Sequence, residues 1–260
     1  MTEETNASES EVQITPVEAS VLLSGAEWDP KLLATTLAQE WEITVPEKDL
    51  PADASESLVF EAEGAVIAVK LFEEPLPAEM ARMHAAMNPL WPQAGAMAQL
   101  HRAHLAVAAI PKTASLVEAA QVLVKVVSSL CNQPSALAID TGATILGTEG
   151  YREGATVMKG GELPLFNLVT FAIAKADETN FVAFTMGMSF LGHNELEISP
   201  TAEKPEVIQE FLYTVASYTL KTGKGLRDGQ ILGLHPEKAQ AVRYAESSMI
   251  PGLKTMQITL

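Results

Sequence analysis

Three side chains that can exchange protons stand close together in residues 192–198, whose sequence is GHNELEI. Alternate residues of an extended strand point to the same side, so Glu195 and Glu197 would share one face. Paired carboxyl groups suit acid–base hydrolysis, in which one donates a proton and the other stays ionised, and His193 would add a base. The same alternation is typical of any half-exposed strand. The segment therefore predicts either a hydrolytic site or an ordinary strand.

Two further histidines, His101 and His104, are spaced to share one side of a helix. Zinc and iron sites need three or more ligands, and no third ligand is near in the sequence. His84 would approach only if a break at Asn88 and Pro89 folds two helical pieces together. A histidine at a helix end can instead hydrogen-bond the last carbonyl groups. We expect this capping role, and we expect neither a metal nor another cofactor.

A small-ligand site is the third possibility. Gly187 and Ser189 belong to an apolar run in which small residues alternate with large ones, and they would leave room for a ligand. Asp228, in the turn GLRDGQILG, is a further candidate for binding. The sequence contains none of the GxSxG, P-loop, HExxH or GxGxxG signatures, so no motif indicates a catalytic class.

These candidates depend on a β-hairpin predicted within residues 165–198. Two apolar runs of strand length flank the polar residues 177–180, which is the pattern of a hairpin. In the second run the large residues extend from Val182 to Phe190 at every second position, with small residues between them. Since neither face is polar, we expect both faces to be covered, the small face lying close under a helix.

The remaining pattern predicts an α+β protein with mostly antiparallel sheet. Strands and helices follow the order β-α-β-β-α-β twice, which favours two ferredoxin-like halves in tandem. A strongly amphipathic helix within residues 111–134 would bridge the N-terminal half, residues 16–110, and the C-terminal half, residues 135–260. Residues 1–15 carry several acids and predict a disordered tail.

Composition restricts the partners. The chain has 33 acidic and 17 basic residues and a net charge of −16, which is unfavourable for nucleic acids and anionic membranes and would suit a basic protein partner. The N-terminus lacks the basic and apolar regions of a signal peptide, and the single cysteine, Cys131, has no partner for a disulfide. We expect a cytoplasmic protein whose oligomeric state the sequence leaves open.

Two stretches resemble the bacterial family known as domain of unknown function 4261. One joins Trp91-Pro92 to residues 101–105, and the other runs from Gly187 through Glu195 and Glu197 to the turn at residues 225–233. Where the family turn usually reads DGD, this chain has Asp228, Gly229 and Gln230. The resemblance implies a cytosolic bacterial α+β protein without an assigned reaction, of an accessory or toxin-immunity type.

Three functions follow as hypotheses. The first is a non-catalytic protein that binds another protein through an acidic surface, which would suit a basic partner. The second is a hydrolase that uses Glu195, Glu197 and His193. The third is a small-ligand binder.

Overall fold

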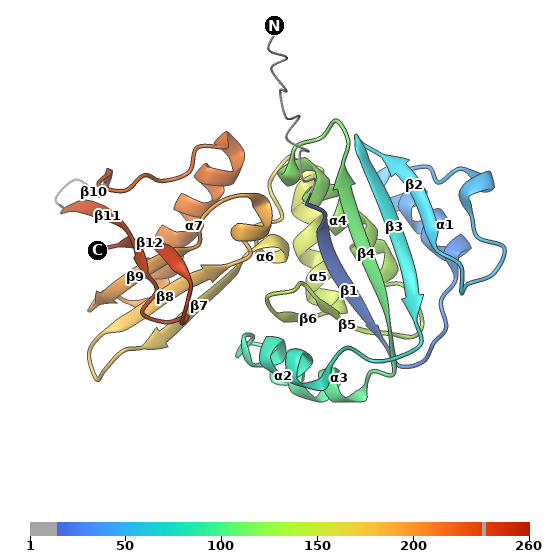
Figure 1. Cartoon of the computed structure of the whole chain (residues 1–260), viewed down its shortest axis with the longest axis horizontal. Coiled ribbons are helices and arrows are strands. Elements are labelled where there is room, and N and C mark those ends of the chain that lie inside the picture. The colour runs from blue at the N-terminus through green and yellow to red at the C-terminus, as the bar shows by residue number, and fades with distance from the viewer. Residues whose placement is uncertain (1–14, 236–237) are drawn as a thin grey trace, which may run out of the picture.

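The computed structural model of the chain describes residues 15–235 and 238–260, and most of the predicted N-terminal tail lies outside these residues. Two six-stranded sheets stand beside each other, with helices packed against them (Figure 1). The predicted α+β class with mostly antiparallel sheet is confirmed. None of the helices in the described part of the chain is both long and apolar enough to cross a membrane.

The first sheet has the strand order β2-β3-β4-β1-β5-β6, and all its neighbouring strands are antiparallel. Its strands are β1 (Val17–Leu23), β2 (Leu58–Ala62), β3 (Ala65–Phe72), β4 (Ala103–Pro111), β5 (Ala136–Asp140) and β6 (Ile145–Gly147).

Helices cover the two faces of this sheet unequally. On one face α1 (Pro30–Trp41) and α4 (Leu116–Leu130) bury the main core together with the odd-numbered residues of β1. A capping box fixes the start of α4, because the Ser115 hydroxyl accepts from the backbone of Glu118 and the Glu118 carboxylate accepts from the backbone of Ser115. On the other face the short helices α2 (Ala78–Ala86) and α3 (Ala94–Leu100) cover only one end, packing on Leu22.

The second sheet has the order β10-β11-β12-β9-β8-β7, and only β12 and β9 are parallel neighbours. Its strands are β7 (Thr170–Lys175), β8 (Phe181–Met186), β9 (Leu196–Thr201), β10 (Ile231–His235), β11 (Lys238–Glu246) and β12 (Lys254–Ile258). The helix α7 (Pro205–Thr222) packs against β7, β8 and β9. Between the sheets, α5 (Thr148–Ala155) contacts α4 and α6 (Leu165–Leu168).

The predicted hairpin is confirmed as β7 and β8, which pair antiparallel about a turn in which Asp177 accepts hydrogen bonds from Thr179 and Asn180. The second strand is shorter than expected. It ends at Met186 because Gly187 has a φ of +119°, and a short 3-10 helix, η3 (Ser189–Leu191), follows. Phe190 consequently leaves the strand and is 46% exposed.

The strand order departs from two ferredoxin-like halves. In that topology the first helix joins two parallel strands with one strand between them. Here α1 joins β1 to β2, which have two strands between them and run antiparallel. The second half has a different plan, in which α7 connects two runs of three strands.

The boundary between the halves also differs from the expected one. The strands β5 and β6 lie beyond Pro134, yet they pair with β1 and extend the first sheet. The helix α4 belongs to the core of that sheet, although it also contacts α6 and η3 on the side of the second half. The chain therefore leaves the first sheet at Gly147.

Candidate functional site

Glu195 is a buried carboxylate whose two oxygens accept hydrogen bonds from the end of β8 and from the loop that follows it. Its side chain accepts hydrogen bonds from the hydroxyls of Thr185 and Ser189, at 2.8 Å each, and from the backbone N–H groups of residues 187, 188 and 189. Glu195 is only 3% exposed. Because five donors surround it, Glu195 fixes the chain after β8 and has no oxygen turned to a cavity.

Glu197 is also a buried carboxylate held by several donors, which come from β12 and from the turn before it. It accepts from the hydroxyls of Ser247 and Ser248, at 2.6 Å each, from the backbone of Ser248 and from the hydroxyl of Thr255. Burial raises the pKa of this carboxyl group, but the hydrogen bonds from Ser247, Ser248 and Thr255 outweigh it, so that the pKa lies below its ordinary value. Glu197 thus stays ionised and ties the turn between β11 and β12 to β9.

The two carboxylates do not form a hydrolytic centre with His193. In the part of the chain that the structure describes, no hydrogen bond joins His193 to Glu195 or Glu197, and burial alone lowers the pKa of His193. His193 lies against Gly225 in a separate polar hollow beside the end of α7. The expected convergence of the three side chains is absent because each carboxylate is directed to its own loop.

The residues predicted to bind a small ligand, Gly187, Ser189 and Asp228, also have structural roles. A side chain at Gly187 would clash with the carbonyl oxygen of Leu168, so a neighbouring segment fills the expected space. Ser189 donates to Glu195, and Asp228 accepts the backbone N–H of Tyr244 at 2.9 Å. These three residues do not meet in one site.

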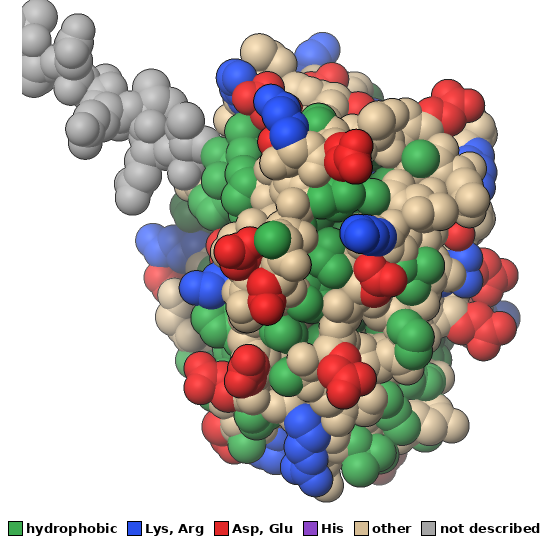
Figure 2. All heavy atoms as spheres, turned by 90° about the vertical axis from the view of Figure 1, so that its right-hand side faces the viewer, with side chains coloured by type: hydrophobic (Ala, Val, Ile, Leu, Met, Phe, Trp, Pro, Cys, Tyr) green, Lys and Arg blue, Asp and Glu red, His purple; other side chains and the backbone are tan. Residues whose placement is uncertain are grey.

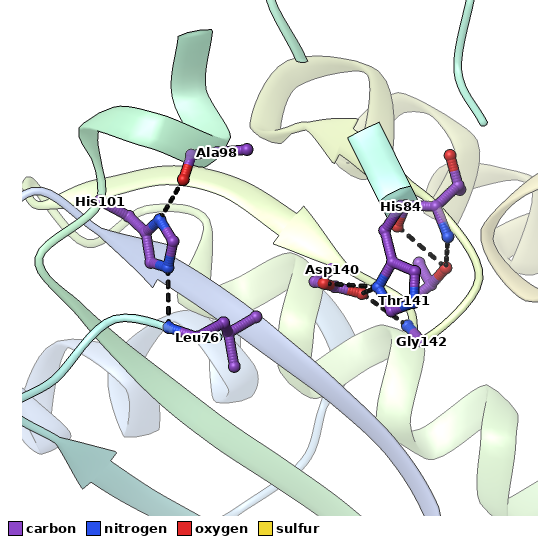
Figure 3. Close-up of polar contacts among 8 residues, drawn as sticks. Leu76, His84, Ala98, His101, Asp140, Thr141 and Gly142 are labelled. Atoms are coloured by element: carbon purple, nitrogen blue, oxygen red, sulfur yellow. Dashed lines mark hydrogen bonds and ion pairs between the residues drawn. The ribbon is translucent and has the colours of Figure 1, made fainter. Parts of the chain in front are cut away.

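His101 has both ring nitrogens engaged in the fold. Its Nδ1 donates to the carbonyl of Ala98 at the end of α3, and its Nε2 accepts from the backbone N–H of Leu76 at 2.9 Å (Figure 3). Burial lowers the pKa of His101, which keeps the ring neutral. The contact with Ala98 is the capping geometry expected at a helix end.

His104 stacks on the ring of Phe72 and bonds the carbonyl of Glu74 through Nδ1. Among the described residues, no group of three or more His, Cys, Asp or Glu side chains is arranged to hold a metal ion. His101 and His104 therefore form hydrogen bonds with backbone groups near α3 and β3.

A third histidine forms the most distinctive polar pair in the molecule. His84 reaches from α2 to Asp140 at the end of β5, and its Nδ1 lies 2.9 Å and 2.8 Å from the two carboxylate oxygens (Figure 3). Asp140 is 3% exposed and also accepts the backbone N–H of Gly142 at 2.8 Å. With Nδ1–H donating to the carboxylate, a neutral ring carries its lone pair on Nε2.

His84 lines a cavity of about 380 Å³ on the part of the first sheet that α2 and α3 leave uncovered. The strand register sets one row of side chains across its floor. Lys70 on β3, Ala106 on β4, Ser20 on β1 and Asp140 on β5 are successive cross-strand neighbours. At ~4.8 Å between strands, Lys70 begins about 14 Å from Asp140, and the small residues between them leave the cavity open.

This arrangement resembles the orienting half of a catalytic triad, in which a carboxylate fixes the tautomer of a histidine whose other nitrogen meets the ligand. No serine or cysteine bonds Nε2 of His84 within the described residues. Cys131 lies elsewhere, at the end of α4, where burial raises the pKa of its thiol to about 12 and makes it a poor nucleophile. A proton taken up by His84 would come from bound water or from the ligand.

The sequence pattern did not reveal this pair. His84 and Asp140 are 56 residues apart and no known motif contains them. The available signal was weak: an aspartate ending an apolar strand, followed by a glycine two residues later, and a histidine on a short helix before a proline break.

Comparison with known proteins finds a family model that matches only part of the chain. Residues 184–259 match the model of a family described as a domain of unknown function (DUF4261), so the predicted resemblance is confirmed for this part. The match includes Glu195, Glu197 and Asp228 but neither His84 nor Asp140. No curated protein and no solved structure matches the chain.

Proposed function

We propose that the protein binds a small polar molecule on the open face of its first sheet and that His84 acts there as a general base. The observation that carries this proposal is the contact of Asp140 with Nδ1 of His84, because it leaves Nε2 as the proton acceptor of a side chain that lines a cavity. General bases need this combination of a fixed tautomer and access to the ligand.

The walls of the cavity favour a polar ligand with a short apolar part, because Glu18 and Lys70 place both charges on its lining. Lys70 supplies a positive charge and lies over the ring of Phe72, with Nζ 5.1 Å from the ring centre. Met80 and Leu76 supply apolar surface from the side of α2. The cavity volume is at the lower end of the range for small-molecule sites.

As a water oxygen attacks the acyl, phosphoryl or sulfuryl centre of a bound ester, His84 would take the proton of that water. When the ester bond to the leaving oxygen breaks, the protonated ring would give this proton to the leaving oxygen, which departs as an alcohol. Asp140 would stabilise the charged ring between these two transfers. Both transfers use Nε2, so the chemistry requires that Nδ1 hold its proton throughout.

The first test is the tautomer of His84 in the free protein. We expect the nitrogen chemical shifts of the neutral ring to show its proton on Nδ1, and we expect this tautomer to be disturbed in Asp140→Asn. A ring with its proton on Nε2 would contradict the proposal.

The second test is a panel of small phosphate, carboxylate and sulfate esters assayed with the wild type and His84→Gln. Hydrolysis is expected to fall by at least about a hundredfold in the variant, as for the loss of a general base. Ser24→Ala, on the surface beyond β1, is a matched control that should leave activity unchanged. Equal activity of the wild type and His84→Gln would reject the proposed role.

A further inference from the structure

The strand β7 is one edge of the second sheet, and a groove runs along it. Consecutive residues from Val169 to Ala174 line this groove. A cavity over one face of a strand would meet only alternate residues, because side chains alternate between the faces. Contact with every residue places the groove beside the backbone of β7, and the lining residues Phe184 of β8 and Gln209 of α7 show that it also reaches over one face of the strand.

The register shows which backbone groups β7 leaves unpaired. The N–H of Ala176 bonds the carbonyl of Asn180, and the pairing continues without a shift to Thr170 and Met186. Hydrogen-bonded pairs alternate in an antiparallel ladder, so Ala174 and Ala172 bond β8. The N–H and C=O groups of Phe171 and Ile173 therefore point away from β8, toward the groove.

The opposite wall comes from the first half of the molecule. Figure 1 shows β7 on the side of its sheet that is turned toward the first half. Leu90, in the connection between α2 and α3, and Leu146 on β6 line the groove, and Leu90 is 89% exposed. Phe166 lies at the groove beside Phe171, with a ring-centre distance of 5.7 Å, and is 56% exposed. The groove has a volume of about 360 Å³.

We propose that this groove binds an extended apolar segment of a partner protein, which adds as a new strand to β7. An unpaired edge strand offers a row of donors and acceptors that another extended chain satisfies, and adjoining apolar pockets accept its alternate side chains. The side chains of Leu90 and Phe166 provide such pockets, so their exposure is accounted for by a bound segment.

The partner segment carries basic residues at its flanks. The chain has a net charge of −16, and at the end of the groove near the turn after β7, Asp177 and Glu178 outnumber Lys175. Complementary charge would steer a basic partner to this end. This inference is independent of the His84 site, since it uses neither His84 nor its cavity.

The test uses a short peptide of alternating valine and threonine residues with lysines at both ends, titrated into the full chain by fluorescence anisotropy. Ile173→Pro removes a backbone N–H that points to the groove but no hydrogen bond to β8, a position where an edge strand tolerates proline. Binding is expected to weaken about tenfold or more in this variant. The matched control, Ile173→Val, keeps the N–H and should bind as the wild type does.

A second measurement does not depend on the folding of a variant. Two forms of the peptide carry N-methyl groups on alternate residues. In one form the methylated nitrogens lie along one hydrogen-bonding edge of the extended peptide, and in the other form they lie along the opposite edge. Added as a strand, the peptide has one edge against β7, so one form should bind and the other should not. Equal binding of both forms, or no binding of the unmodified peptide, would overturn the proposal. Dimers of the chain that Ile173→Pro dissociates would also overturn it, by showing a second copy in the groove.

Discussion

The buried carboxylates of the two halves differ in how completely they are satisfied. At the start of β9 in the second half, Glu195 and Glu197 each accept hydrogen bonds from several donors. At the end of β5 in the first half, Asp140 accepts from His84 and one backbone N–H, and His84 lines a cavity. The comparison teaches that burial of an acid does not mark a site of chemistry. Asp140 differs because its partner, His84, uses only Nδ1 in their contact and keeps Nε2 for another group.

The largest effect is expected for Glu195→Gln. The amide has one oxygen in place of two and brings an NH₂ group against the backbone donors of the loop at residues 187–189. Losing charge-assisted hydrogen bonds in a buried site should lower the free energy of unfolding by about 3 kcal/mol, measured by urea denaturation. The exposed Glu162, paired with Lys221, gives a matched control, since Glu162→Gln should change stability little. A stable Glu195→Gln would remove the structural role assigned to Glu195.

A smaller and pH-dependent effect is expected for Glu197→Gln. The pKa of Glu197 lies below its ordinary value of 4.5 in the folded protein, so its ionised form stabilises the fold above that pH. Unfolding experiments at several pH values should show a loss of about 2 kcal/mol at neutral pH, which shrinks as the pH falls through the folded pKa. The control is Glu246→Gln, an exposed residue near Lys254. A difference between wild type and Glu197→Gln that stays constant down to acidic pH would contradict the ionised state of Glu197.

The smallest effect on stability is expected for Asp140→Asn. An asparagine oxygen can still accept from Gly142 or His84, and α2 keeps its apolar contacts with the sheet. Thermal or urea unfolding should change by about 1 kcal/mol or less, even though the tautomer of His84 is disturbed. If Asp140→Asn destabilised the protein as much as Glu195→Gln, Asp140 would belong with the structural carboxylates and the comparison would fail.

Local patterns predicted the elements better than their partners. The β7–β8 hairpin follows from a polar turn between two apolar runs, and α4 follows from its apolar stripe and its cap. Residues 136–147 lie in the predicted C-terminal half, residues 135–260, but they do not join the second sheet. They form instead the hairpin of β5 and β6, whose place is decided by pairing with β1, more than 110 residues earlier. Apolar composition alone carries no information about such distant pairing.

The candidate site shows the same limit. Alternation correctly placed Glu195 and Glu197 at the start of an extended strand, but their role depends on donors from other segments, such as Ser247 and Thr255, which are 50 and 58 residues away from Glu197. His84 and Asp140 meet only because α2 folds back over the end of β5. Neither residue has a local pattern that reports this contact.

The β7–β8 hairpin has a practical consequence for fragments of this protein. The part of the chain that matches the family begins at residue 184, in the middle of β8. A recombinant piece cut at that residue would lose β7 and half of β8, leaving Glu197 beside a truncated neighbour. A fragment intended for expression should therefore start before Leu165, so that the hairpin and the carbonyl of Leu168 against Gly187 are kept.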